Sequence, residues 1–413
     1  MRNIDKCLLI IWLDALRSSY INERDTPFLS KISQESLFGV YRPTMAYVGI
    51  GMSIFTGVKA STHGAWTEFR YNPDRSPFGW TSGVMPLLAL SDLVTQHSGR
   101  VGHYGRAALN KVIFLVSNRL SGRTYVPIGK QVPSSRLHYF DVSIMHNEIS
   151  HKDASVTPTL FDILRSQSIT FRSLEESSHG DETIFRKALL VDRKARVVFI
   201  QFSELDRVGH EHGPNSVEIK AALHRIDKRM RQLFEAYQSF FELEVFILSD
   251  HGMIEVEETI DVQGALHRYG LKEGSDFIAC YDSTIARFWS LRVPLQVIER
   301  YVRSIKGGEI LPTMRLENLG VPHDRAYGDL VWLANPGNII LPNYYQGLKH
   351  VKGMHGYFPG SSGLEAPYII YSRNIPQGKA ERIANPVDIL PTILSILNID
   401  IPDYVEGKSL LSE

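Results

Sequence analysis

The chain has 413 residues, of which 43% are hydrophobic and 22% charged, so it can bury a large core. Lys plus Arg and Asp plus Glu each total 45, which excludes a broad nucleic-acid-binding or membrane-binding surface, although a local patch would not change this sum. Its two cysteines lie outside any metal or redox motif, and no apolar stretch reaches the roughly 18 residues of a membrane span. We therefore expect a cytoplasmic protein without a disulfide framework.

The N-terminal part of the chain predicts two strands that alternate with two helices. The apolar run Cys7–Leu13 is typical of a central parallel strand and stops at Asp14. Residues 25–27 (Asp-Thr-Pro) are a helix start signal. A second strand is expected over 37–41 and a short helix over 48–55.

Residues 66–150 are rich in Tyr, Arg, Pro and Ser and show no regular alternation, so we interpret them as an insertion that covers a site. A second segment of mixed character, residues 258–345, is interpreted in the same way. The remaining segments, 1–65, 151–257 and 346–413, form the predicted α/β core: a doubly wound, mostly parallel sheet with helices on both faces. Its further expected elements are helices over 158–164, 217–237 and 388–397 and strands over 169–171, 196–202, 244–249 and 367–371.

Acidic and histidine side chains recur where these strands end, and ligands of open α/β sheets bind at that edge. Asp14 and Asp250 each follow a strand directly, although a carboxylate there could instead cap a helix. Asp206 and His210 are four residues apart, so one helical turn can direct both at one ion. We expect Gly252 to turn the backbone so that His251 reaches the same ion as Asp250. His355, beside Gly356, is a further candidate.

Six such side chains are enough for two adjacent metal sites of three ligands each. Imidazole with carboxylate suits zinc, and also manganese or iron. Two ions about 4 Å apart polarise a phosphoryl oxygen, activate the attacking oxygen and stabilise the leaving group. The pattern therefore predicts a two-metal hydrolase of a small-molecule phosphate ester.

The motifs, in this order, resemble the alkaline phosphatase superfamily, most closely its type I phosphodiesterase/nucleotide pyrophosphatase branch. The matching stretches span nearly the whole chain: 12–14, 53–57, 63–64, 204–214, 249–253, 355–357, 386–392 and 406–410. The resemblance implies one ion held by Asp206, His210 and His355. It implies a second ion held by Asp14, Asp250 and His251, and in-line attack on phosphorus by a hydroxyl of the chain.

The sequence departs from the family pattern at the nucleophile. Counted back without gaps from Thr56-Gly57, the family's threonine falls on Tyr47, and an asparagine that holds a phosphoryl oxygen falls on Ile50. Tyr47 is the first candidate because it needs no gap, and Thr44 is the second. Water activated by the ions is the third. A cysteine or serine is absent at this position, which argues against a formylglycine sulfatase.

Arginine suits phosphate, so Arg17 and Arg70 are candidate substrate contacts, with Arg106, Lys111 and Arg287 as further cations. Two other functions stay open: a phosphomutase or a phospho- or sulfo-transferase on the same scaffold, and a degenerate protein that binds a phosphorylated ligand without turnover. The sequence decides neither the leaving group nor the oligomeric state.

Overall fold

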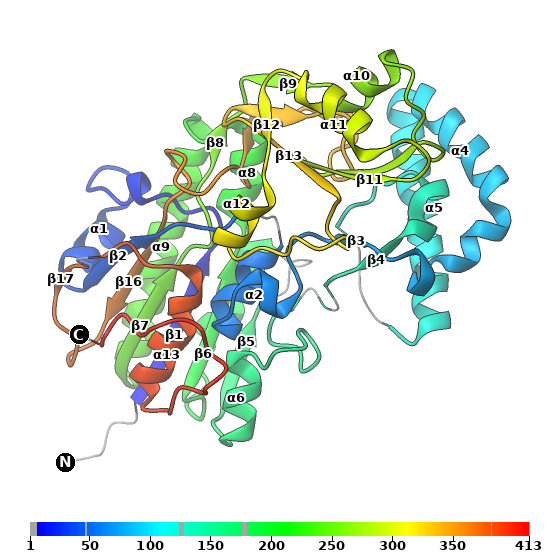
Figure 1. Ribbon diagram of the computed structural model, residues 1–413. Coiled ribbons are helices and arrows are strands. Elements are labelled where there is room, and N and C mark those ends of the chain that lie inside the picture. Colours follow the sequence, from blue (N-terminus) through cyan, green and yellow to red (C-terminus); the bar gives the residue numbers. More distant parts are fainter. Residues whose placement is uncertain are drawn as a thin grey trace.

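The computed structural model describes residues 6–45, 48–123, 128–144, 146, 148–175, 180–380 and 382–412. Its core is a sheet of seven strands in the order β17-β2-β16-β7-β1-β6-β5 (Figure 1). Among these strands β16 is antiparallel to its neighbours and the other six are parallel, which confirms the expected fold class. The strands are β1 (Lys6–Leu13), β2 (Leu37–Tyr41), β5 (Phe171–Leu174), β6 (Val197–Phe202), β7 (Glu242–Leu248), β16 (Ala366–Tyr371) and β17 (Gly378–Lys379).

The central strand β1 is apolar on both faces because it separates two hydrophobic cores. Leu8, Ile10 and Trp12 point into one core, and the alternate residues Leu9 and Ile11 point into the other. This double burial explains why the strand reads as a continuous apolar run.

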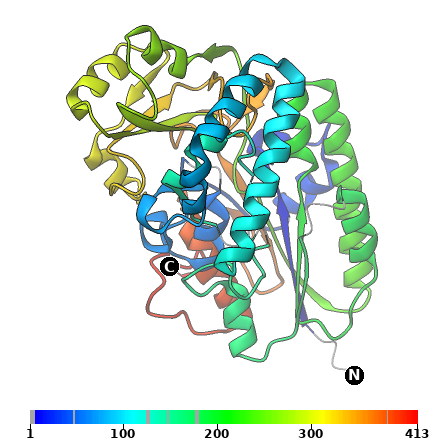
Figure 2. The same cartoon turned by 90° about the vertical axis from the view of Figure 1, so that its right-hand side faces the viewer.

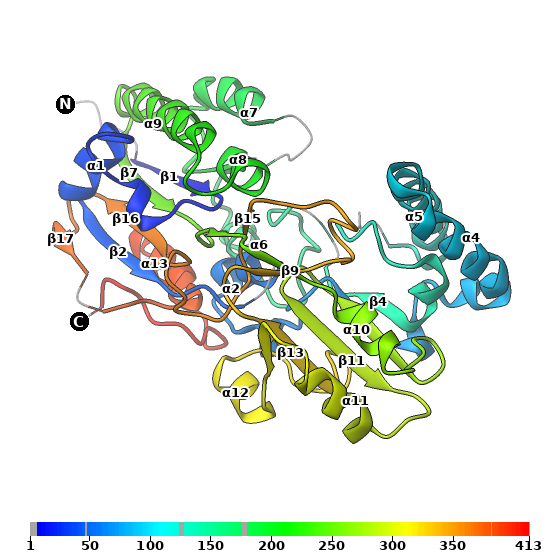
Figure 3. The same ribbon diagram turned by 90° about the horizontal axis from the view of Figure 1, so that it is seen from above.

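Helices cover both faces of the sheet, as Figure 3 shows from above. One face carries α1 (Pro27–Gln34), α7 (Gly180–Leu189), α8 (Glu204–His212) and α9 (Val217–Gln238). The other carries α2 (Gly49–Thr56), α3 (Ala60–His63), α6 (Leu160–Ser166) and α13 (Ile389–Leu397). None of the described helices is long and apolar enough to cross a membrane.

The two segments interpreted as insertions contribute no strand to the seven-stranded sheet in the part of the chain that the structure describes. They share one apolar core, in which the rings of Phe140 and Trp289 lie 5.8 Å apart. We propose that they form a cap with the boundaries given above. The first contains β3 (Phe69–Tyr71), α4 (Met85–His97), α5 (Gly99–Ser121) and β4 (Phe140–Val142). The second contains β9 (Glu258–Ile260), α10 (Val262–Arg268), β10 (Phe277–Tyr281), β11 (Ile285–Ser290), α11 (Leu295–Arg303), β12 (Gly308–Ile310), α12 (Thr313–Asn318), β13 (Leu330–Ala334) and β14 (Asn338–Ile340).

Within residues 66–150, where the sequence shows no regular alternation, the structure has a helical hairpin of α4 and α5 that the sequence analysis did not identify (Figure 2). Glycines at 99, 102 and 105 lower the intrinsic helix propensity of α5. Its apolar residues lie on its exposed side as well as its buried side, which hides the period of 3.6 residues.

Candidate metal centre

The first group of ligand-type side chains lies at the ends of β1 and β7. The Nε2 atom of His251 is 3.5 Å from Asp14 Oδ1 and 3.2 Å from Asp250 Oδ2. Its Nδ1 donates a hydrogen bond to the carbonyl oxygen of Gly252 at 2.8 Å, so the lone pair of Nε2 is free to bind a metal ion. Asp250 Oδ1 accepts the backbone N–H of Ala15, which ties the two strand ends together.

Gly252 is needed for close packing rather than for a left-handed turn. A Cβ atom at this position would lie 2.0 Å from the carbonyl oxygen of Gly363, and the Gly252 N–H donates to the carbonyl of Leu364. Its φ is not positive. The close contact with residues 363–364 therefore requires a glycine at this position.

The second group joins α8 to a turn that follows β15 (Gly353–Met354), a strand paired with β8 (Ile254–Glu255). Asp206 Oδ1 lies 3.2 Å from His210 Nε2 and 3.7 Å from His355 Nε2. His210 Nδ1 donates to the carbonyl oxygen of Gly353 at 2.8 Å, so its Nε2 is likewise free to bind a metal ion.

The six side chains form two adjacent triads. Within each triad the ligand atoms lie within 4.8 Å of one another. The His251 and His355 rings stack across the two triads, with centroids 3.6 Å apart. One oxygen of Asp14 and one of Asp206 are buried and have no hydrogen-bond partner among the described residues. Buried carboxylate oxygens require a partner, and a divalent cation is one that fits this nitrogen and oxygen donor set.

Burial and neighbouring charged groups change the proton affinities of Asp14 and Asp206. Burial raises the pKa of Asp14 well above the ordinary carboxyl value, and the charges of Asp250 and Asp206 raise it further. Burial also opposes ionisation of Asp206, but His210 and His355 lower its pKa below the usual range. Without a cation, the site therefore opposes ionisation of Asp14.

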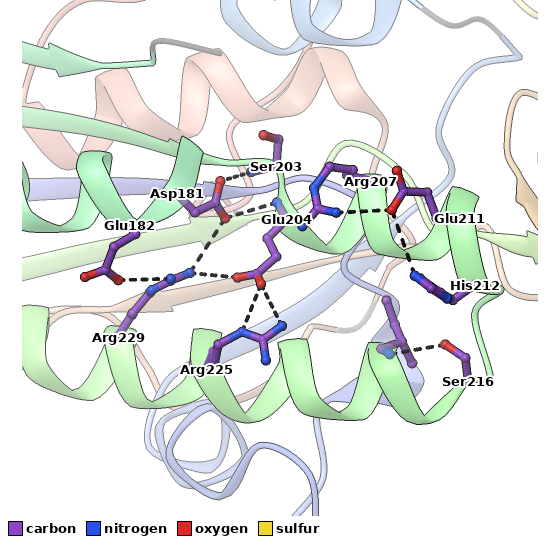
Figure 4. Close-up of polar contacts among 11 residues, drawn as sticks. Asp181, Glu182, Ser203, Glu204, Arg207, Glu211, His212, Ser216, Arg225 and Arg229 are labelled. Atoms are coloured by element: carbon purple, nitrogen blue, oxygen red, sulfur yellow. Dashed lines mark hydrogen bonds and ion pairs between the residues drawn. The ribbon is translucent and has the colours of Figure 1, made fainter. Parts of the chain in front are cut away.

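An ion-pair network holds α8, the helix that carries Asp206 and His210 (Figure 4). Asp181 of α7 accepts the backbone N–H groups of Ser203 and Glu204 at 3.0 Å each, which caps the helix N-terminus. The Glu204 carboxylate accepts from Arg229 at 2.8 Å and from Arg225 at 2.7 Å, both on α9.

Arg229→Met is expected to lower the free energy of unfolding by about 3 kcal/mol, since it leaves the Glu204 carboxylate without its buried partner. It should also weaken metal binding about tenfold, because α8 loses its position. Thermal unfolding and metal titration measure the two effects. Arg225→Met is the control, because Arg225 is half exposed and should change stability by less than about 1 kcal/mol. Equal effects of both variants would contradict this role.

The candidate nucleophiles are only partly placed by the structure. Thr44 is half-buried in the loop between β2 and α2, and Tyr47 lies outside the described residues. Ile50, at the family's asparagine position, lies in the first turn of α2 and is buried in the apolar core. The choice of nucleophile stays a prediction.

The candidate substrate cations have different surroundings. Arg17 is half-buried, and its Nη2 lies 2.9 Å from where a Cβ on Gly363 would be, beside the stretch that packs on Gly252. Arg70 pairs with the buried Asp141 at 2.8 Å, across the β3–β4 pair. Arg287 is fully buried beside Asp282, so its guanidinium has no access to solvent. Phosphate contacts by Arg17 and Arg70 stay predictions.

Sequence reasoning missed Thr284, which lies in the turn between β10 and β11. Its buried hydroxyl donates to the carbonyl oxygen of Gly356 at 3.1 Å and so connects the proposed cap to the turn that carries His355. A threonine in a turn has no distinguishing pattern, so no sequence signal could have identified it.

Comparison with known proteins identifies the family of the chain. A family model described as type I phosphodiesterase/nucleotide pyrophosphatase matches residues 8–358. The chain belongs to this family. The resemblance that the motifs indicate is thus confirmed.

One relative within this family is distant in sequence. Ectonucleotide pyrophosphatase/phosphodiesterase family member 7 of Mus musculus is 22% identical over 280 residues, which cover 63% of this chain and 53% of that protein. The chain therefore spans about half the length of that curated relative.

Solved structures of human and murine ectonucleotide pyrophosphatase/phosphodiesterase 5 show the same fold. The human protein superposes with a TM-score of 0.69 at 13% identity, over 98% of this chain and 97% of that one. The murine protein, as an inactive variant in complex with AMP, gives 0.67 at 12% identity over 96% of each chain.

Proposed function

We propose that this protein hydrolyses a phosphodiester or pyrophosphate bond of a nucleotide-type small molecule, with two divalent ions in the two triads. The observation that carries the proposal is the pair of adjacent triads, each with ligand atoms within 4.8 Å. Zinc is the first choice of ion, and manganese or iron are alternatives. The AMP complex of the murine relative supports a nucleotide substrate. A cytoplasmic location is part of the same proposal.

Charge balance supports two ions rather than one. The triads contain three carboxylates, with a formal charge of −3, and two divalent ions would bring +4, for a net charge of +1. A phosphodiester carries one negative charge, so the occupied site attracts it. When bound, the ions supply a Lewis acid for the phosphoryl oxygen and lower the pKa of the attacking hydroxyl.

The chain's own groups orient the reaction. His210 and His251 are fixed in the tautomer that leaves Nε2 as the ligand atom, because each Nδ1 donates to a carbonyl oxygen. Arg17, three residues after Asp14, is the proposed cation for a non-bridging phosphoryl oxygen.

The test uses the purified protein and measures its metal content by elemental analysis. Activity is measured with three nitrophenyl substrates: a nucleotide phosphodiester, a phosphomonoester and a sulfate ester. We expect about two equivalents of a divalent metal and the fastest turnover with the diester. Product analysis separates hydrolysis from transfer, because a transferase needs an acceptor other than water. A metal-free protein without turnover would contradict the proposal.

Tyr47→Phe is expected to lower kcat at least about 100-fold, because the phenol, with an ordinary pKa of about 10, is the proposed attacking group. Thr44→Val is the matched variant and should change kcat far less. Intact mass of acid-quenched enzyme detects the phosphoryl adduct. Loss of the adduct only in Thr44→Val would move the assignment to Thr44, and activity in both variants would assign attack to water.

A second candidate function is binding of a phosphorylated ligand without turnover. Ile50 favours it, because a buried isoleucine cannot hold the phosphoryl oxygen that the family's asparagine holds. Calorimetric titration of the metal-loaded protein with AMP, together with the ester screen, separates the two functions. Tight binding without turnover, unchanged in Tyr47→Phe, would support this candidate.

A further inference from the structure

The outer side of α5 exposes a row of large apolar side chains at helical spacing. Val101, Tyr104, Val112 and Leu115 are each between 60% and 78% exposed, and Ala108, in the middle of the row, is also exposed. These positions fall within one face of the helix, since they recur at intervals of three and four residues. Figure 2 shows α4 and α5 at the front of the molecule.

The neighbouring helix α4 adds exposed apolar side chains to the same hairpin. Leu87, Leu90 and Val94 recur at the same spacing and are between 58% and 70% exposed. Inner residues of the hairpin, among them Leu88 and Ile113, pack into the core of the cap, so the helices are anchored without their outer rows. Single exposed leucines are ordinary on a protein surface. Apolar rows along two neighbouring helices instead indicate a surface that binds a membrane or another protein.

The hairpin carries more positive than negative charge. Residues 84–123 contain five Lys or Arg and a single acid, Asp92. Asp92 is engaged inside the fold, since it lies 3.6 Å from Arg106 and accepts the backbone N–H groups of Ser134 and Ser135. Arg123 pairs with the buried Asp141 at 2.6 Å, whereas Lys111 and Arg119 are exposed beside the apolar row of α5.

We propose that the α4–α5 hairpin binds the surface of an anionic phospholipid bilayer, with the apolar row of α5 in the headgroup and acyl-chain boundary. Amphipathic helices with basic flanks and no exposed acids have this preference. A second copy of the chain fits less well, because two such hairpins would bring positive charge against positive charge. The zero charge of the whole chain conceals the patch, since acids elsewhere balance it. This surface is independent of the proposed hydrolysis.

Co-sedimentation of the full chain with vesicles tests the proposal. We expect binding to phosphatidylcholine vesicles that contain phosphatidylserine and weak binding to phosphatidylcholine alone. Val101→Glu combined with Leu115→Glu should lower the bound fraction at least about tenfold. Lys111→Gln combined with Arg119→Gln should lower it about fivefold for each cation removed.

The matched control is Val217→Glu combined with Met314→Glu, since these apolar side chains are 77% and 70% exposed outside the hairpin. The control should bind vesicles like the wild type, and melting curves check that every variant folds. The proposal is overturned if the wild type stays in the supernatant with both vesicle types, or if neutral vesicles bind equally well. It is also overturned if the Val101 and Leu115 changes only dissociate a dimer in sedimentation velocity.

Discussion

Asp250→Asn is expected to lower kcat/KM for the nucleotide diester about a thousandfold and to remove about one equivalent of bound metal. Asp250 Oδ2 lies 3.2 Å from His251 Nε2, and its other oxygen accepts the N–H of Ala15, so one carboxylate serves both the ligand set and the strand ends. An amide oxygen keeps the shape but loses the charge that binds a cation. Several kcal/mol of transition-state stabilisation depend on the ion, and each 1.36 kcal/mol is a factor of ten in rate.

Asp227→Asn separates this effect from the general cost of changing a buried carboxylate. Asp227 of α9 caps α1 by accepting the backbone N–H groups of Phe28 and Leu29 at 3.0 and 2.8 Å, and it lies outside both triads. The control should lose stability by about 1 kcal/mol but keep its metal and its kcat. If Asp250→Asn keeps full metal content and activity, the first triad is not a catalytic metal site.

The core of the fold could be predicted because its strands are buried on both faces. The run Cys7–Leu13 reads as a strand, and β1 occupies Lys6–Leu13 between the two cores. The helix expected over 217–237 occupies Val217–Gln238, since one of its sides is apolar and the other polar. The hairpin of α4 and α5 escaped prediction for the opposite reason, as its apolar residues lie on both the buried and the exposed sides.

The sequence places Asp14 and Asp250 at the sheet edge because each follows a strand, and it pairs Asp206 with His210 because they are one helical turn apart. His355 was singled out only by the neighbouring Gly356, and the role of all six as ligands stays a prediction. What the sequence could not show is the surrounding support. Arg229 and Glu204 meet through the packing of α9 on α8, and Thr284 reaches Gly356 over 72 residues of chain. Such contacts depend on tertiary packing, which leaves no periodic signal.

Removal of metal with a chelator is expected to abolish hydrolysis and lower the melting temperature. Ions that bind the folded chain stabilise it by about 4 kcal/mol when their concentration is a thousandfold above Kd. The two buried oxygens of Asp14 and Asp206, which have no hydrogen-bond partner within the described part of the chain, are where we expect this stabilisation to act. Thermal unfolding with and without chelator, followed by readdition of zinc, measures the effect. An unchanged melting temperature in chelator would contradict metal binding at the triads.

Asp14→Asn is expected to raise the melting temperature when the site holds no metal and to lower it when the site holds zinc. Burial and the charges of Asp250 and Asp206 raise the pKa of Asp14 in the folded chain. A carboxyl whose pKa is higher in the folded than in the unfolded chain stabilises the folded state fully when the pH is below its unfolded pKa. That stabilisation is lost as the pH rises through the folded pKa. At about pH 8 in chelator, Asp14→Asn is therefore expected to melt higher than the wild type, with a smaller difference at about pH 5. With zinc present the order should reverse, because the variant lacks a ligand. The same order of melting temperatures in both conditions would show that Asp14 is structural and does not bind the ion.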